Sequence, residues 1–589
     1  MLQIITGKFF VTDELYVTRQ RGVLYTNYRC HMRDIITTAV GTLSPVTVRG
    51  DVGSFIYEVD ERLEAVRPDG QREFLMAAGI EYLIEDFAAV VSFALNITCT
   101  PNIDLARRLT QSTRPSLGAP KLPKEYIGRV FDEEVNWAET DAGRLQSFIT
   151  DLVGLERKNF KSVMRAIRRY VHGLHRISDD PDLAYSLLVA SIESLAQDFD
   201  EFVPTWEDYS QNKRQEFDKV LADAPLGITE GIHNIILKNE HMALGRRYRE
   251  FVLKHLDPSF FRAEAQAEAN PVRSRTLPTV LESAYQSRSS YVHSLRELPR
   301  ILTSVPSHSD VIMIGEKPVL SFHGLARIAR HVIHHVVAHA VKVEHEVFDY
   351  RQDLPNTVQL PLADQFWMWQ AEGYRQETAR QYLSAFLRQL AGFWGGGSAG
   401  ITDIRPIIAK VERVVPGLAK PEQRLPLLVL YVLFHDTAAL EYQQPGWSVF
   451  LNRYLTDFDA PSVENLILYV LTNQTPPWTL NEYEEIYQRY FKQRYSKNGL
   501  QYEALFETAT TLSLAEAYRQ DGNEVRAYAL VQEAVENLPK HQRLLKFEAE
   551  LSSPIPPIVW IEILLPQKAA EPAAEAAEPA AKAAEPAAG

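Results

Sequence analysis

The sequence of 589 residues predicts an α+β protein that is mostly α-helical, with a β-rich N-terminal domain, a central helical bundle and a C-terminal helical domain. Short runs of β-forming residues, separated by Gly, Pro and Asp, fill residues 1 to about 105. From about residue 140 onward, apolar residues recur at intervals of three and four, as in an amphipathic helix. The chain is also too long for one hydrophobic core, because single cores stop growing at roughly 250–300 residues.

Changes in composition along the chain set the expected domain boundaries. A connector with three prolines at 113–123 ends the β-rich region. In the last residues, Glu-Pro pairs repeat every seven positions among alanines, so no position offers the large apolar residues that a coiled coil or a core requires. We therefore place the β-rich domain at 1–125, the helical bundle at 140–350, the C-terminal helical domain at 355–560 and a disordered tail at 567–589.

Hydrophobic periodicity then predicts the individual elements. We expect strands at residues 7–12, 22–32, 53–66 and 90–100. We expect the bundle to contain a β-hairpin within 306–321 and helices at 141–157, 180–199, 231–239, 244–256, 277–298 and 323–348. In the C-terminal domain, the apolar run 425–434 predicts a buried helix. Residues 514–544 are similar to one tetratricopeptide-type helix pair, although a solenoid usually needs three or more repeats.

The composition narrows the classes of function. A net charge of −14 argues against broad, nonspecific DNA binding, which uses a large basic surface, but leaves room for local basic patches that bind RNA. Two cysteines, Cys30 and Cys99, are too few for a disulfide framework or a four-thiolate metal site. We find no apolar run near the roughly 20 residues that span a bilayer, no secretion signal and no phosphate-binding loop. We expect a cytoplasmic protein with no membrane partner and no ATP-driven chemistry.

The stretch "SAYQSRSSYVHSL", residues 283–295, holds the candidate catalytic pair, Arg288 and His293. Arg288 lies in line with an apolar stripe, so we expect it to need a partner, either another subunit or an anion. His293 ends an adjoining polar stripe. The two residues are about 140° apart around an ideal helix, so they would converge only if the helix bends or if two copies meet across a twofold axis.

This pair suits RNA cleavage without a metal. A base must take the proton of the ribose 2′-OH and an acid must protonate the 5′-oxygen leaving group, and histidine can do either near neutral pH. The transition state spreads negative charge over the phosphate oxygens, which a planar guanidinium can bind in bidentate fashion.

"RSSYVH", residues 288–293, is similar to the Arg-x(4–6)-His motif of HEPN endoribonucleases. Residues 182–199, 284–294 and 325–337 resemble the early core helix, the motif helix and the closing helix of the Apea-like branch, which is found in bacterial anti-phage abortive-infection systems. The resemblance covers roughly residues 145–350. It implies a HEPN-type bundle, a homodimer whose motifs face each other, products with a 2′,3′-cyclic phosphate, and no cofactor or metal.

By the same resemblance, Arg288 and His293 are the catalytic residues, supported by Gln286, Ser289 and Tyr291. Ser289 stands where many members of the branch carry Asn, Asp or His. The substrate would be a cellular or phage RNA, such as tRNA, and a phage-derived or protein trigger would control the activity.

Two clusters of arginine are candidates for RNA binding: Arg165, Arg168 and Arg169 in one, Arg246 and Arg247 in the other. Solvated helix faces would give the same pattern. Arg165 and His172 also fit the Arg-x(6)-His spacing, but they precede the segment that resembles the core helix.

Other motifs point to other functions. His331, His335 and His339 have the i, i+4, i+8 spacing of helical zinc ligands, yet the intervening Val and Ile predict a core helix with histidines on its edge. "GGSAG", 396–400, follows a helical segment and therefore predicts a linker rather than a nucleophile elbow. His435 and Asp436 resemble the His-Asp pair of a phosphohydrolase, but they lie in an apolar helix without companion ligands, so we expect them to belong to the core. The alternative function for the whole chain is a non-catalytic, HEPN-like protein that dimerises and binds a partner or senses a signal.

Overall fold

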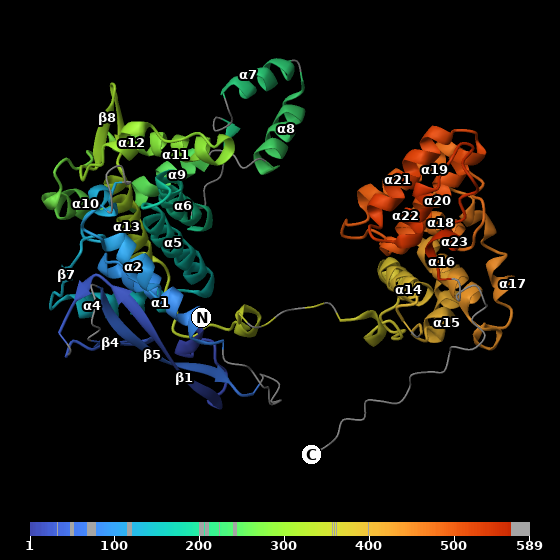
Figure 1. Cartoon of the computed structure of the whole chain (residues 1–589), viewed down its shortest axis with the longest axis horizontal. Helices are drawn as coiled ribbons and strands as arrows, with labels where there is room; N and C mark the ends of the chain where they lie inside the picture. The colour runs from blue at the N-terminus through green and yellow to red at the C-terminus, as the bar shows by residue number, and fades with distance from the viewer. Residues whose placement is uncertain are drawn as a thin grey trace. The chain divides into compact units, whose positions relative to one another are not determined.

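The computed structural model describes residues 1–566 except 32, 47–51, 67–77, 115–120, 200–204, 207–210, 223, 240–243, 356, 358–359, 361 and 399. The tail expected at 567–589 lies outside the described residues. The chain divides into two compact units, Met1–Gln359 and Leu360–Gly589. As the sequence predicts, the protein is mostly helical, with a small antiparallel sheet near the N-terminus (Figure 1).

The sheet is built around two long strands that pair antiparallel along their whole length, β1 (Leu15–Thr26) and β5 (Gly53–Glu64). Its strand order is β3-β4-β5-β1-β6, with β3 (Ile36–Thr38) and β4 (Gly41–Val46) at one side and β6 (Cys99–Thr100) at the other. The short strands β2 (Tyr28–Arg29) and β7 (Val135–Asn136) pair in parallel.

Two of the expected strands are wrong. Residues 7–12 form no strand: Gly7, with φ +84°, ends the short 3-10 helix η1 (Ile4–Thr6) and turns the chain. The strand expected at 90–100 belongs mostly to helix α1 (Ile80–Leu95), which is buried at every position from Phe87 to Leu95. A helix buried all round has no polar face, so its apolar run shows no helical period in the sequence.

The helical bundle of unit 1 contains α4 (Asp141–Gly154), α5 (Arg157–Arg176), α6 (Pro181–Phe199), α9 (Leu244–His255), α11 (Leu277–Ser294) and α13 (Phe322–His339). The β-hairpin expected within 306–321 is present as β8 (Val311–Ile314) and β9 (Lys317–Leu320). One hydrophobic core runs continuously from the sheet through α1 into the bundle. The regions expected to be separate domains, 1–125 and 140–350, are therefore parts of one compact unit.

Helix α13 ends at His339, nine residues before the end expected for it at 348. Ala340 is extended and ends the helix. The residues that follow form backbone hydrogen bonds with distant parts of unit 1. The N–H of Val343 donates to the carbonyl of Gly154, and the N–H of Glu346 donates to the carbonyl of Lys8. These long-range backbone bonds have no signature in local sequence.

Helices α7 (Gln211–Val220) and α8 (Leu226–Asn239) differ from the helices of the bundle because none of their described side chains is buried. They contact each other through His233, whose Nε2 lies 3.7 Å from a carboxylate oxygen of Asp218. The indole of Trp206 stacks on the ring of His233, with 3.7 Å between the ring centroids.

Unit 2 is helical and has its own core. Its main helices are α14 (Ala379–Trp394), α15 (Arg405–Val414), α16 (Pro421–Thr437), α18 (Val463–Leu471), α19 (Leu480–Gln493), α20 (Ala504–Gln520), α21 (Glu524–Asn537), α22 (Gln542–Ala549) and α23 (Trp560–Leu564). The apolar run 425–434 lies in the buried helix α16, as expected. Helices α20 and α21 form the predicted pair, and Gly522, with φ +83°, makes the turn between them. In the part of the chain that the structure describes, no helix is both long enough and apolar enough to cross a membrane.

Candidate active site

Helix α11 carries the candidate catalytic pair, and only its first half is anchored in the core. Its buried residues are Leu277, Val280, Leu281 and Ala284, one face over the first two turns. The apolar stripe expected to continue beyond them is instead exposed: Val292 is 51% and Leu295 is 78% exposed. Leu295 takes the left-handed conformation, φ +50°, and ends the helix. The last turns of α11, with the motif on them, therefore lie at the surface.

Arg288 has a partner within its own chain. Its Nη2 lies 2.8 Å from Oε2 of Glu193, a residue of α6 whose side chain is only 6% exposed. The hydroxyl of Tyr285 lies 3.5 Å from the other carboxylate oxygen of Glu193 and donates to it. Arg288 therefore has the partner that its position requires, but this partner is a buried carboxylate of the same chain and not another subunit or a bound anion.

The charges around Glu193 form a small network. Burial raises the pKa of Glu193, although the charges of Arg288 and Arg169 and the hydrogen bond from Tyr285 act in the opposite direction. Burial also lowers the pKa of Arg169, and the nearby charge of Arg165 lowers it further. Three guanidinium groups, those of Arg165, Arg169 and Arg288, thus share one neighbourhood with two carboxylates, those of Glu193 and Asp198, so one positive charge remains in excess.

His293 lies in the last turn of α11 and is exposed. Arg288 and His293 belong to one continuous helix, five positions and about 140° apart, and Arg288 is turned towards α6. Within one chain, the structure does not direct the two side chains to a common point.

The three supporting residues have different surroundings. Burial and a hydrogen bond with Asp180 raise the pKa of Tyr291. The amide of Gln286 is exposed and donates to Glu282 over 3.4 Å. Ser289 is half-buried. Of the three, only Tyr291 is tied to another helix, because Asp180 immediately precedes α6.

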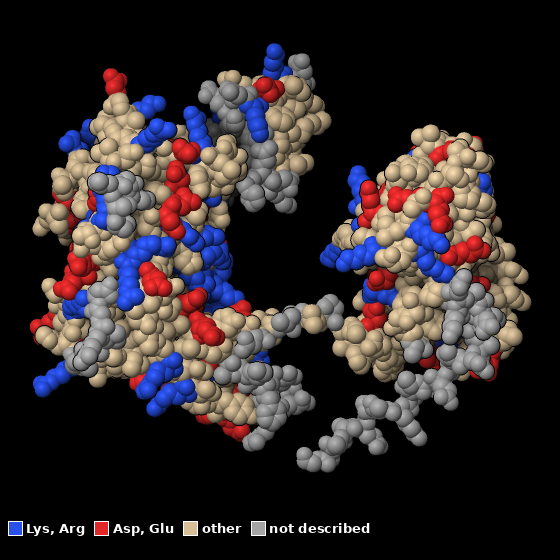
Figure 2. Space-filling model, viewed as in Figure 1, with Lys and Arg blue, Asp and Glu red and all other residues tan. Residues whose placement is uncertain are grey.

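The five arginines expected to bind RNA lie on two helices, α5 and α9, and those of α5 divide between two sides of the helix. Arg165 pairs with Asp198 at 3.2 Å, on the same side of α5 as Arg169. Arg168 instead binds Asp86 of α1 at 2.6 Å. Arg246, exposed, and Arg247, half-buried, lie in the first turn of α9. Figure 2 shows lysine and arginine side chains gathered over the part of unit 1 where Figure 1 places α5 and α6.

Two residues of this site were not predicted from the sequence, Glu193 and Tyr285. Glu193 lies in the run "VASIESLA", where its neighbours on α6 are almost all buried. A lone acid on the apolar face of a helix is a signal that a cation lies nearby, since carboxylates are rarely buried without a partner. That signal could have identified Glu193 as the residue that holds an arginine.

The histidines of α13 take part in polar contacts at the edge of the core. His331 is 7% exposed, and its Nδ1 lies 2.8 Å from Oε1 of Glu264. The ring of His334 lies between those of Phe93 and Phe148, with 4.8 Å between the centroids in both cases, and burial lowers its pKa far below the usual value. Nδ1 of His335 lies 3.1 Å from Nδ1 of His255, at the end of α9.

One group of three side chains has donor atoms close enough to hold a metal ion among the described residues: Glu268, Asp310 and His323, within 4.8 Å of one another. Asp310 is fully buried, however, and its carboxylate accepts two hydrogen bonds from Arg327. That guanidinium already supplies the positive charge that a metal would bring, so this group is a weak cation site.

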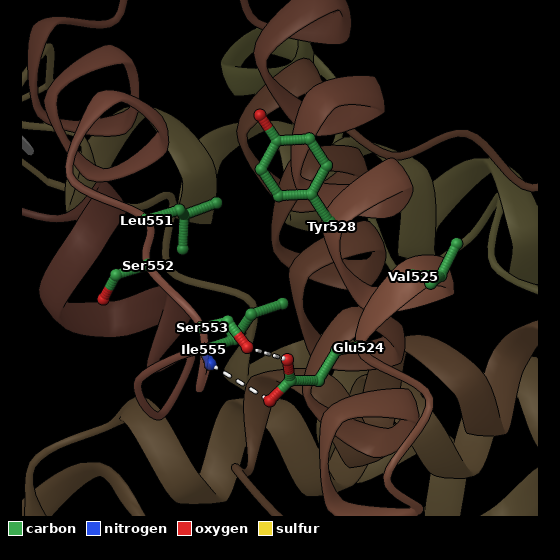
Figure 3. Close-up of a pocket in the computed structure, with 7 residues that line it drawn as sticks. All are labelled: Glu524, Val525, Tyr528, Leu551, Ser552, Ser553 and Ile555. Atoms are coloured by element: carbon green, nitrogen blue, oxygen red, sulfur yellow. Dashed lines mark hydrogen bonds between the residues drawn. The ribbon is translucent and has the colours of Figure 1, made fainter.

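Unit 2 holds a groove of ≈ 380 Å³ between α21 and the segment after α22 (Figure 3). Its lining residues are Glu524, Val525, Tyr528, Leu551, Ser552, Ser553 and Ile555. The Glu524 carboxylate accepts hydrogen bonds from the Ser553 hydroxyl at 2.8 Å and from the Ile555 backbone at 3.3 Å. A lining with neither histidine nor a basic side chain offers no group suited to the RNA chemistry considered for α11.

Comparison with models of protein families, with curated proteins and with solved structures gave no match to this chain. The likeness to HEPN endoribonucleases therefore rests on the residues of the motif and their setting.

Proposed function

We propose that this protein is a metal-independent endoribonuclease of the HEPN type that acts in the cytoplasm in anti-phage defence, by abortive infection. The observation that carries the proposal is the pair on α11: Arg288 lies among a group of guanidiniums, and His293 is exposed on the same helix near its end. A guanidinium and an accessible imidazole that meet at one phosphate are the minimum set for cleavage that uses the ribose 2′-OH.

The proposed active form is a homodimer. Because one straight helix does not aim Arg288 and His293 at one phosphate, two copies would contribute across a twofold axis. The exposed apolar side chains at this end of α11, Val292 and Leu295, support a contact between copies there.

The proposed reaction moves two protons. One imidazole, His293, takes the proton of the 2′-OH while the 2′-oxygen attacks the phosphorus and forms the cyclic phosphate. The P–O5′ bond breaks, and the leaving 5′-oxygen takes a proton from His293 of the partner subunit. Arg288 stabilises the charge on the phosphate oxygens, with its guanidinium held in place by Glu193.

Arg165 and Arg169 would increase the attraction for the RNA backbone beside Arg288. Arg168, which binds Asp86 of α1, would contribute less. Gln286 and Ser289 lie next to the pair in sequence and are available to the RNA, whereas Tyr291 chiefly fixes α11 against the start of α6 through Asp180.

One observation favours the alternative, a non-catalytic HEPN-like protein that dimerises and binds a partner or senses a signal. Arg288 is already bound to a buried carboxylate, as expected of an arginine that stabilises the fold. The two proposed functions make different demands on His293: the nuclease requires its imidazole, whereas the non-catalytic protein does not.

The deciding experiment compares RNA ends in cells that express the wild type, His293→Ala, or the control His345→Ala, which removes another exposed histidine. We expect new ends with 2′,3′-cyclic phosphates for the wild type and the control only. In vitro, cleavage should persist in EDTA and fail on RNA whose ribose at the cut site is 2′-deoxy. Equal cleavage by the His293 variant would rule out the proposed site and leave the alternative.

A further inference from the structure

Two imidazole rings from different helices meet at the surface of unit 1. His255 is the last residue of α9 and His335 lies in the second half of α13, and their Nδ1 atoms are 3.1 Å apart. His339, one turn after His335, stacks on it with 4.1 Å between the ring centroids. Three imidazoles from two elements that are far apart in sequence thus lie in one cluster.

Two ring nitrogens at this distance need something between them, either a single shared proton or a metal ion. Two zinc–imidazole bonds of about 2.0–2.1 Å at a nearly tetrahedral angle separate their nitrogens by roughly 3.1–3.4 Å. The observed 3.1 Å is therefore the separation that two ligands of one ion would have. The i, i+4 spacing of His335 and His339 places a third ring on the same helix face.

The charges around the pair are compatible with a cation. Asp257 follows α9 and its charge acts on His335, while Lys254, which is exposed, acts on His255. The other histidine on this face, His331, is already bound to Glu264.

Arrangement and charge distinguish this pair from the group of Glu268, Asp310 and His323. In that group, the guanidinium of Arg327 already donates hydrogen bonds to the buried carboxylate of Asp310. Among the described residues, no guanidinium contacts the two nitrogens that meet between His255 and His335, and His339 is exposed, so solvent can reach the site.

We propose that His255 and His335 bind a divalent transition metal of the zinc class through their Nδ1 atoms, with His339 as the third ligand and water completing the coordination. His339 Nδ1 now contacts the carbonyl of His335 at 2.9 Å, so its other nitrogen, Nε2, is the one to reach the ion after a side-chain rotation. The metal would join the end of α9 to α13.

Such a link would act on α11 from a distance. At the start of α9, Gly245 lies against the ring of Tyr285, where a Cβ atom would come within 2.9 Å of the ring. Tyr285 is the residue that donates to Glu193. An ion that fixes α9 would therefore restrict the helix that packs against the Arg288 network, whether or not that network cuts RNA.

The test is calorimetric titration of the full-length protein, first treated with chelator, with Zn²⁺ and separately with Mg²⁺. We expect one Zn²⁺ per chain, no comparable binding of Mg²⁺, and a rise in melting temperature with Zn²⁺ only. His255→Gln and His335→Gln should each weaken Zn²⁺ binding by roughly tenfold or more, with a smaller loss for His339→Gln.

Two controls make the result specific. His323→Gln should leave the affinity unchanged, and a loss there would move the site to the Glu268 group and overturn the proposal. His345→Gln should also bind as the wild type does, since it removes an exposed histidine outside the cluster. If the wild type fails to bind Zn²⁺, or if the folded double variant of His255 and His335 binds it equally well, the two rings share only a hydrogen bond.

Discussion

Helices α11 and α13 both carry histidines that the sequence marks as candidates, yet the structure treats them differently. Most of α13 is buried, and its histidines contact Glu264, the ring of His255 and two phenylalanines. The core holds only the first half of α11, and His293 lies exposed beyond it. A histidine that packs against other side chains is suited to stabilise the fold or to bind an ion. An exposed histidine at the end of a helix is suited to contact a substrate.

The sharpest test of this contrast is His293→Ala. RNA cleavage should fall by about 10²–10⁴-fold, the usual contribution of a general acid or base. The free energy of unfolding should change by less than about 0.5 kcal/mol, because the side chain is exposed. Cleavage of a labelled RNA and denaturant unfolding measure the two effects, and a large loss of stability would show that His293 is structural.

On α13 the opposite outcome is expected for Arg327→Met. Asp310 is fully buried, and the variant leaves its charge without a guanidinium, so unfolding should become easier by about 3–5 kcal/mol. Adding Asp310→Asn should recover part of the loss. RNA cleavage per folded molecule should stay near the wild-type value. A loss of cleavage without a loss of stability would contradict the view that α13 stabilises the fold and α11 acts on the substrate.

Arg288→Ala should have an intermediate effect, because this residue belongs to both the site and the fold. We expect cleavage to be lost and the protein to be destabilised by about 1–3 kcal/mol, since Glu193 would be left buried without its partner. Arg288→Lys should restore the charge but not the planar fork, and so recover cleavage only in part. Full activity of the alanine variant would exclude Arg288 from the reaction.

The smallest of the four effects is a dependence of stability on pH. Burial lowers the pKa of His255 and His175 to about 4 and that of His334 well below its usual value, whereas unfolded histidine titrates near 6.5. The unfolded chain therefore binds more protons between these values, and stability should fall as the pH falls from about 6.5 to 4.

His334→Phe keeps a ring between Phe93 and Phe148 but removes one titrating group, so the fall should become shallower. His293→Ala is the matched control on α11 and should leave the slope unchanged. Unfolding curves at several pH values measure the slope of stability against pH for both variants. If His334→Phe has the same slope as the wild type, His334 does not contribute to the pH dependence.

The parts of the fold that were predictable are those with a clear period. Helices α6 and α9 begin and end within about a residue of their expected bounds, because polar residues interrupt their apolar stripes. Helix α1 was not predictable, since an apolar segment buried on all sides loses its period.

The candidate site was predictable only along one helix. Spacing identified Arg288 and His293, but the buried partner of Arg288 belongs to α6 and the partner of His335 to α9. Such pairings depend on how helices pack, which local spacing does not encode.

The helical pair α7 and α8 has one more consequence. With no buried side chain among those described, the pair gives up little packing when it opens, so its local unfolding costs far less than that of the core around it. Within unit 1, a protease should therefore cleave the native protein first between α6 and α9 and leave two fragments that the continuous core still holds together.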